Sequence, residues 1–211
     1  MLTALNYANI CKTSYKKNRC KMKGCCKTEY MYIGNERVIM TRGTQQMEDI
    51  IQDLSFTHEY NEELGVNLHN GFSKFAYEVI DYLDSETDLN MCDGVNFTGH
   101  SAGGSILSIV SAILAKRGYN VNKITTFGEP KITDKEGAKE IMKLVKNRER
   151  YVSENDIVVQ LPPQYGEHVG KEIKLTSKMT TRSKRYGIIK YYVRAHWLDN
   201  YINGLKNKYD V

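Results

Sequence analysis

Long apolar runs are missing from this sequence of 211 residues. No stretch of 18 consecutive apolar residues occurs, which excludes an ordinary membrane-spanning helix. The N-terminal apolar stretch is interrupted by Asn6 and Asn9 and has no basic region ahead of it, so it does not resemble a signal peptide. We therefore expect residues 1–211 to form a single domain of an intracellular protein, soluble or peripherally attached to a membrane.

Cysteine is scarce and oddly spaced. The chain has five, namely Cys11, Cys20, Cys25, Cys26 and Cys92. An odd set with two adjacent members does not suggest a disulfide framework, so reduced thiols are expected. The segment CKMKGCC lacks both a Cys-x-x-Cys pair and a second cluster of ligands, so neither a metal nor a cofactor is predicted.

Positive charge is concentrated in two segments. Residues 12–27 carry seven Lys or Arg and no acid, and residues 171–194 carry eight Lys or Arg with Glu172 as the only acid. Because the whole chain has a formal charge of +5, the remainder is net negative. These segments predict either solvated loops and edge strands or contact with an anionic membrane surface. Nucleic acid is the less favoured partner.

Predicted strands and helices alternate along the chain. Hydrophobic patterns and turn residues predict a hairpin over 29–42, helices over 46–54, 73–85, 101–118 and 133–148, strands over 94–98, 123–130, 150–153 and 186–193, and a closing helix that contains Trp197. Thr133 and Glu136 have the spacing of a capping box, and Asp134 is placed at the same helix start. A strand, a helix and a strand in this order form a βαβ unit. The pattern predicts an α/β fold with a mostly parallel central sheet.

The segment FTGHSAGGSIL, residues 97–107, contains a G-x-S-x-G motif. It places Ser101 between Gly99 and Gly103, directly after a predicted strand, with His100 inside the turn. In a nucleophile elbow this arrangement exposes the serine Oγ at the carboxyl end of a strand, where open α/β sheets hold their sites. The alternative is a small residue at an ordinary strand-to-helix junction.

A nucleophilic serine needs a histidine as general base and an acid that orients it. In α/β-hydrolases the chain order is serine, acid, histidine. His58 and His69 precede the serine and His100 is its neighbour. Of the remaining two, His196 follows a complete later strand and is the preferred base, whereas His168 has a structural role as its default interpretation.

Asp156 is the preferred acid. It lies in SENDIV, after the predicted strand RYVS and within the required interval of the chain. Glu129 and Asp134 follow the preceding strand more closely, and Asp134 is better explained as part of a helix N-terminus. An ordinary turn aspartate that bonds nearby backbone amides is the alternative for Asp156.

Two donors are predicted for the oxyanion that forms during acyl transfer. One is the backbone N–H of Ala102 at the start of the helix after the elbow. The other is Thr44 in the segment RGT, where Gly43 allows a close approach of the backbone. An N-cap turn is the alternative interpretation of RGT.

Several separate segments resemble the class 3 lipase family of the α/β-hydrolase fold. They are TRGTQQMEDIIQDL, HNGF, FTGHSAGG, TTFGEP, SENDIVVQLPP with YGEHVG, and AHWLDNYI. The resemblance implies Ser101 as nucleophile, Asp156 as orienting acid and His196 as base, with Thr44 and Ala102 as the oxyanion hole. It also implies helices on both faces of the sheet.

The resemblance further implies that the helix over 46–54 is a lid. Its apolar face would consist of Met47, Ile50, Ile51 and Leu54, covering the site in water and turning toward lipid at an interface. A fixed surface helix is an equally good interpretation, because periodicity does not reveal motion. The chain is short for the family and has thiols where secreted members use disulfides, which argues against extracellular fat digestion.

The expected function is that of a lipase or esterase. It would hydrolyse ester bonds of acylglycerols or phospholipids through a Ser-His-Asp triad and an acyl-enzyme, as a triacylglycerol lipase or a phospholipase of the A1 type. The alternative is a catalytically inactive protein of the same fold that binds lipid surfaces or nucleic acid through its basic segments.

Overall fold

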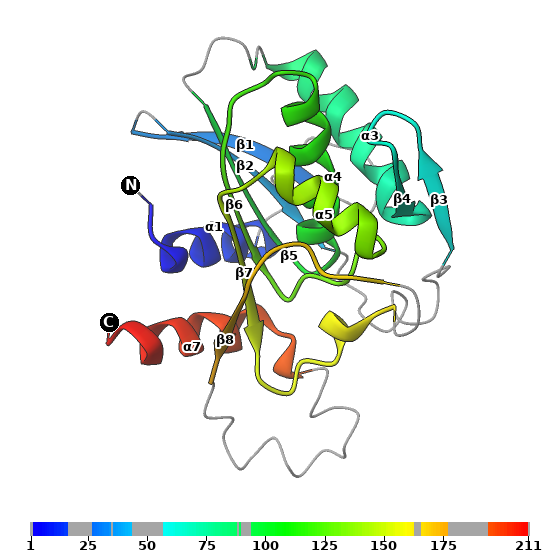
Figure 1. Ribbon diagram of the computed structural model, residues 1–211. Coiled ribbons are helices and arrows are strands. Elements are labelled where there is room, and N and C mark those ends of the chain that lie inside the picture. Colours follow the sequence, from blue (N-terminus) through cyan, green and yellow to red (C-terminus); the bar gives the residue numbers. More distant parts are fainter. Residues whose placement is uncertain are drawn as a thin grey trace.

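The structure is a computed structural model that describes residues 2–16, 27–34, 36–43, 57–87, 89, 94–162, 166–176 and 194–210. Within these residues the central element is a six-stranded sheet with the order β1-β2-β5-β6-β7-β8 (Figure 1). Only β1 runs antiparallel, as one arm of a hairpin with β2; the other neighbours are parallel. The strands are β1 (Lys27–Ile33), β2 (Glu36–Arg42), β5 (Val95–His100), β6 (Val121–Phe127), β7 (Arg148–Ser153) and β8 (Glu172–Leu175).

Helices cover both faces of this sheet. One face carries α1 (Ala4–Lys16) and α7 (Leu198–Tyr209), which contact each other. The opposite face carries α3 (Asn70–Glu86), α4 (Ala102–Lys116) and α5 (Lys135–Leu144), as Figure 1 shows. The predicted α/β-hydrolase architecture, a mostly parallel sheet between helices, is therefore confirmed.

The alternating sides of β2 explain why two layers of helices are needed. Ile39 belongs to the apolar core under α3, α4 and α5, whereas Val38 and Met40 belong to the core under α1 and α7. All six residues of β5 are buried, as expected for a strand covered on both faces. Residues 102–114 of α4 are buried all round, which places this helix at the centre of its layer.

The start of α5 corrects one prediction. The N-cap is Asp134, whose Oδ1 accepts a hydrogen bond from the Gly137 N–H at 2.8 Å. The capping box predicted for Thr133 and Glu136 is wrong, because the Thr133 hydroxyl donates instead to the Asn67 carbonyl at 2.5 Å. The placement of Asp134 at the helix N-terminus is confirmed.

Five elements of the described residues were not predicted: α1, the two hairpin strands β3 (His58–Asn61) and β4 (Val66–His69), the strand β8, and the short 3-10 helix η2 (Val158–Gln160). The helix over 46–54 and the strand over 186–193 lie outside the described residues. Among the helices that are described, none has the length and apolarity to cross a membrane.

Candidate active site

Ser101 occupies a sharp turn between β5 and α4. Its backbone angles are φ 59° and ψ −137°, a conformation that is costly for any residue with a Cβ. The turn is held in place because the Ser101 N–H donates to the Phe127 carbonyl at 2.9 Å. The sequence motif thus forms a strained elbow at the carboxyl end of a central strand.

The glycines on either side of Ser101 have a steric reason. A Cβ on Gly99 would lie 2.6 Å from the Gly103 carbonyl, and a Cβ on Gly103 would lie 2.1 Å from the Thr41 carbonyl oxygen in β2. Neither distance is possible for a real side chain. The two glycines let the first turn of α4 pack directly on its own strand and on β2.

The predicted acid and base are in direct contact. Asp156 follows β7, His196 precedes α7, and Nδ1 of His196 lies 2.7 Å from Oδ2 of Asp156. Both side chains are 0% exposed. The Nε2 atom of His196 is also buried, and it has no hydrogen-bond partner among the described residues. The imidazole is therefore anchored at Nδ1, which leaves Nε2 for proton transfer.

Two further donors hold the Asp156 carboxylate. The Val158 N–H donates to Oδ1 at 2.9 Å, and the Tyr201 hydroxyl donates to Oδ2. Burial raises the pKa of Asp156, but the neighbouring His196 and these donors outweigh it and bring the net pKa below its usual value. Burial and the nearby carboxylate raise the pKa of Tyr201, so its hydroxyl keeps the proton that it donates.

The loop after β6 joins the elbow to the acid and the base. Phe127 accepts the Ser101 N–H, and the next residue, Gly128, lies against the acid–base pair. A Cβ on Gly128 would be 2.9 Å from Cε1 of His196 and 3.1 Å from Oδ2 of Asp156. Asp156 and His196 thus meet at Gly128, the residue directly after the one whose carbonyl accepts the Ser101 N–H.

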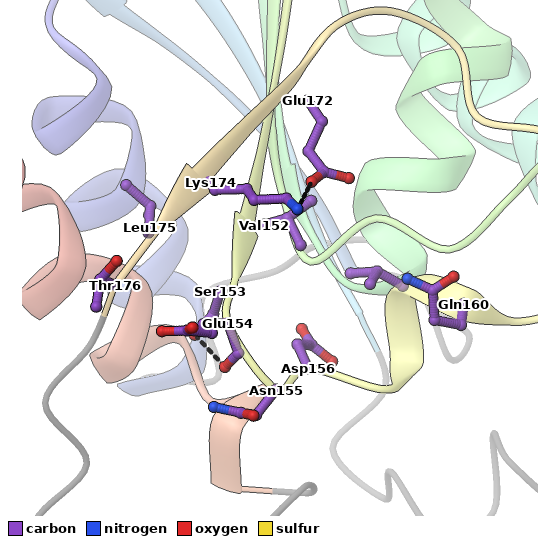
Figure 2. Close-up of a pocket in the computed structure, with 11 residues that line it drawn as sticks. Val152, Ser153, Glu154, Asn155, Asp156, Gln160, Glu172, Lys174, Leu175 and Thr176 are labelled. Carbon is purple, nitrogen blue, oxygen red and sulfur yellow. Dashed lines mark hydrogen bonds and ion pairs between the residues drawn. The ribbon is translucent and has the colours of Figure 1, made fainter.

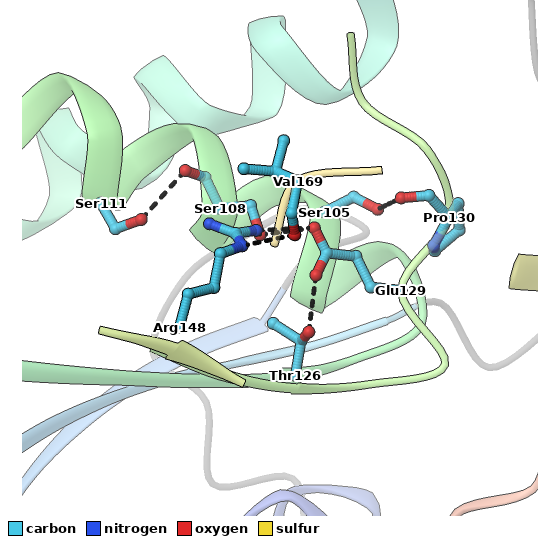
Figure 3. Close-up of polar contacts among 8 residues, drawn as sticks. All are labelled: Ser105, Ser108, Ser111, Thr126, Glu129, Pro130, Arg148 and Val169. Carbon is cyan, nitrogen blue, oxygen red and sulfur yellow. Dashed lines mark hydrogen bonds and ion pairs between the residues drawn. The ribbon is translucent and has the colours of Figure 1, made fainter. Parts of the chain in front are cut away.

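The competing acid, Glu129, has a different environment, shown in Figure 3. Its carboxylate accepts hydrogen bonds from Thr126 at 2.5 Å and from Ser108 at 2.6 Å, and it pairs with Arg148 at 3.0 Å. The Glu129 and Arg148 side chains are 1% and 0% exposed. Glu129 is therefore committed to the packing of α4 against β6 and β7. The competing base, His168, is not the partner of Asp156; burial, then Arg150, lower its pKa to about 3.

Only part of the predicted oxyanion hole is described. Ala102 is the first residue of α4, where backbone N–H groups point out of the helix and the helix dipole favours negative charge. Gly43 lies beside it, since a Cβ there would be 3.0 Å from Cβ of Ser101 and 3.4 Å from N of Ala102. Thr44 follows Gly43 in the chain but lies outside the described residues, as do the predicted lid residues Met47, Ile50, Ile51 and Leu54.

A pocket of about 330 Å³ lies beside the acid (Figure 2). Asp156 lines it together with Asn155, Gln160, Glu172 and Lys174, among others from β7, β8 and η2. Glu172 and Lys174 approach each other to 3.6 Å across its wall. The lining mixes these polar groups with Val152, Val159 and Leu175, and we assign no substrate to the pocket.

Sequence reasoning missed Tyr201 and Gly128. Both lie in segments that carry the family resemblance, AHWLDNYI and TTFGEP, so the resemblance held the only sequence signal for them. Tyr201 reaches Asp156 because α7 begins two residues after His196 and turns its first buried face toward the acid.

Residues 38–166, more than half of the chain, match the sequence model of the class 3 lipases. The chain belongs to the class 3 lipase family. The predicted family is therefore confirmed. The matched residues begin after α1 and end before His196.

Solved structures of fungal lipases share the fold of this chain. The triacylglyceride lipase of Rhizomucor miehei is 25% identical with a TM-score of 0.66, over 71% of this chain and 62% of that one. A lipase of Rhizopus microsporus var. chinensis is 21% identical with a TM-score of 0.67, over 84% and 74%. A triacylglycerol lipase whose catalytic centre is a serine protease triad is 22% identical with a TM-score of 0.60, over 82% and 77%. The chain thus spans less than two thirds of the Rhizomucor protein.

Proposed function

We propose that this class 3 lipase is a serine hydrolase that cleaves carboxylic ester bonds of lipids. The observation that carries the proposal is the buried contact between His196 and Asp156, 2.7 Å long, beside a strained serine elbow. The Rhizomucor relative is a triacylglyceride lipase, and another relative has a serine protease triad at its catalytic centre. Both relatives support the same chemistry for this chain.

In the first half of the reaction, His196 acts as general base. Its Nε2 takes the proton of the Ser101 hydroxyl while Oγ attacks the ester carbonyl carbon. The carbonyl oxygen becomes an oxyanion, stabilised by the Ala102 N–H and by Thr44. The imidazolium that forms is stabilised by the Asp156 carboxylate, which stays ionised because its pKa is lowered.

His196 then acts as general acid to complete acylation, and as general base again when water attacks the acyl-enzyme. It gives its proton to the leaving alkoxide, so the alcohol departs and the acyl group stays on Ser101. Water then enters, loses a proton to Nε2 of His196 and attacks the acyl carbon. Collapse of this second intermediate releases the fatty acid and returns the proton to Oγ, so no net charge or atom is lost.

The finer assignment is a preference for anionic phospholipid over neutral triglyceride, as a phospholipase of the A1 type. It is supported by the basic segments 12–27 and 171–194 of a chain with a formal charge of +5. Basic residues near an anionic bilayer contribute about 1 kcal/mol each to attraction. Parallel assays on anionic phospholipid vesicles and triglyceride emulsion test it, and equal rates would rule out the preference.

The catalytic proposal is tested by Ser101→Ala against a matched variant. Ser111 is also a buried serine of α4, but its hydroxyl only bonds the Ser108 carbonyl at 2.9 Å. We expect Ser101→Ala to lower hydrolysis of p-nitrophenyl butyrate by at least about 10³-fold, because the nucleophile is gone. Ser111→Ala should retain the wild-type rate. Equal rates for Ser101→Ala and wild type, in purified folded protein, would refute the proposal.

A further inference from the structure

We propose that Tyr15 and His100 are positioning residues that hold the catalytic base from behind, through its backbone. The inference rests on the proposed function and adds to it a relay, here meaning the Tyr15 hydroxyl, the His100 ring and the His196 carbonyl. The relay links α1, which precedes the family match, to the base, which follows it.

The contacts of the relay are short; the one between His100 and His196 is buried and the one to Tyr15 is partly buried. The Tyr15 hydroxyl lies 2.9 Å from Nδ1 of His100, and Nε2 of His100 lies 2.8 Å from the His196 carbonyl oxygen. The rings of His100 and His196 stack at a tilt, with centroids 4.7 Å apart. His100 is 5% exposed and His196 is 0% exposed. His100 therefore contacts both the ring and the main-chain carbonyl of His196.

The direction of each hydrogen bond in the relay is fixed. A carbonyl oxygen only accepts, so Nε2 of His100 must carry the proton. Burial, and then the nearby His196, lower the pKa of His100 to about 3, so the ring is neutral at pH 7. With its proton on Nε2, the neutral ring must accept at Nδ1, and the Tyr15 hydroxyl supplies the donor. Tyr15 thereby selects the His100 tautomer that can hold His196.

The relay supplies a second anchor point for His196, on its backbone, in addition to the contact with Asp156. Asp156 anchors the imidazole of His196 at one atom, Nδ1, about which the ring can still pivot. A second anchor on the carbonyl oxygen fixes the backbone from which the ring projects. Because His100 is also the residue directly before Ser101, the same side chain ties the base to the elbow that holds the nucleophile. The relay therefore sets the position of Nε2 relative to Oγ.

The surroundings of the relay are also ordered. Arg42 donates to the Ser14 carbonyl at 3.2 Å and lies over the Tyr15 ring at 5.4 Å, which fixes the end of α1. The Tyr201 ring meets His100 edge-on at 5.9 Å. The charged and titratable groups that face the two histidines in the described residues are thus Asp156, Tyr201 and Tyr15, and Arg42 lies over the Tyr15 ring.

The kinetic test compares Tyr15→Phe with Tyr30→Phe. Tyr30 is the matched control, because its hydroxyl donates to the Glu86 carbonyl at 3.2 Å, away from the site. With p-nitrophenyl butyrate we expect Tyr15→Phe to lower kcat about 10-fold with KM unchanged, since a small displacement of a catalytic group affects the chemical step. Tyr30→Phe should match wild type. Equal kcat in the two variants would overturn the relay.

A double-mutant cycle tests whether Tyr15 acts through His100. His100→Leu removes the donor to His196 and should lower kcat about 100-fold. Adding Tyr15→Phe to it should cause no further loss, whereas multiplied losses would show that Tyr15 acts independently and overturn the relay. His100→Gln should recover most of kcat, because its amide N–H₂ donates whatever the state of Tyr15. If His100→Leu does not fold, the same cycle with His100→Gln decides the question.

A measurement without turnover separates this inference from the proposed function. The proton on Nδ1 of His196, bonded to Asp156, is expected to give a far-downfield proton NMR signal. Tyr15→Phe should broaden or remove that signal, and Tyr30→Phe should leave it intact. An unchanged signal in Tyr15→Phe contradicts the relay even if no ester is hydrolysed, and a changed signal supports it independently of Ser101 chemistry.

Discussion

Glu129 and Asp156 are two buried carboxylates that follow neighbouring strands of the same sheet, β6 and β7. Glu129 is buried and faces the layer of α3, α4 and α5; Asp156 is buried and faces α7. Both accept several hydrogen bonds. They differ in the partner, which is the Arg148 guanidinium for Glu129 and the His196 imidazole for Asp156.

The partner decides what each carboxylate can do. A guanidinium keeps its proton under all ordinary conditions, so the pair of Glu129 and Arg148 is a fixed pair of charges that can only hold elements together. An imidazole gains and loses a proton near neutral pH, so the carboxylate of Asp156 can stabilise a charge that exists only during a reaction. Burial therefore does not distinguish a catalytic acid from a structural one, and the titration of its partner does.

The largest expected effect follows from a change to Asp156, the carboxylate that contacts the catalytic base. Asp156→Asn keeps the size of the side chain but removes the charge and the correct acceptor for His196. We expect kcat for p-nitrophenyl butyrate to fall by about 10⁴-fold, with a melting temperature close to wild type. Steady-state kinetics and thermal unfolding of the same preparation check this. A loss smaller than 10-fold would remove Asp156 from the mechanism.

Glu129→Gln should lower stability and leave kcat nearly unchanged. Removing the charge leaves Arg148 buried without a counter-ion, which costs about 3–5 kcal/mol of unfolding free energy. The folded fraction should keep kcat within about threefold of wild type, because Glu129 does not touch the acid–base pair. Denaturant unfolding and active-site-normalised kinetics measure the two quantities. A stable but inactive variant would contradict the structural role.

Gly128→Ala should impair catalysis and also lower stability. Gly128 has φ +62°, and an added methyl would meet His196 and Tyr201 at 2.9 Å. We expect kcat to fall about 10- to 100-fold as the imidazole is displaced, and the unfolding free energy to fall by about 1–2 kcal/mol from backbone strain. Kinetics and denaturant unfolding show which is larger. Wild-type kcat in this variant would mean that the loop does not position the base.

The smallest expected effect is on the pH dependence of stability, through His69 at the start of α3. Burial, then nearby His58, lower the pKa of His69 to about 4, and its Nδ1 accepts the Phe72 N–H at the start of α3. Between pH 6.5 and pH 4 the unfolded chain binds a proton at His69 and the folded chain does not. The contribution of neutral His69 to the free energy of unfolding is therefore lost as the pH falls from about 6.5 toward 4.

His69→Asn should flatten this dependence by about 1–2 kcal/mol, because asparagine caps the helix without titrating. His58 and its neighbour Asp134 are titratable groups near His69, and both stay in place in this variant. Urea unfolding at pH 7 and pH 4.5 measures the difference. An unchanged pH slope would place the acid sensitivity elsewhere, for example at Asp156.

Local patterns were enough to predict the main architecture. The apolar strands, the helix after Ser101 and the glycines of the elbow follow from periodicity and from steric limits within a few residues. Chain order was enough to favour Asp156 over Glu129 and His196 over His168. The structure places the two chosen residues in contact, and their catalytic roles stay a prediction for the experiments above.

Contacts between distant parts of the chain could not be predicted. The Thr133 hydroxyl bonds Asn67 rather than its own helix, which made the capping box wrong. Tyr15 meets a residue 85 positions away, and nothing in its own segment marks it. Strand β3 contains His58, Glu59 and Asn61 and lacks the apolar alternation by which strands are recognised, and β4 alternates over only four residues.

Labelling with a fluorophosphonate probe tests the central claim most directly. The account predicts one adduct on the intact protein, located by peptide mass spectrometry at Ser101, absent in Ser101→Ala, much slower in Asp156→Asn and normal in folded Glu129→Gln. Folded wild-type protein that forms no adduct, or forms it at another residue, would contradict the account. That result would favour a protein that binds lipid surfaces or nucleic acid without catalysis.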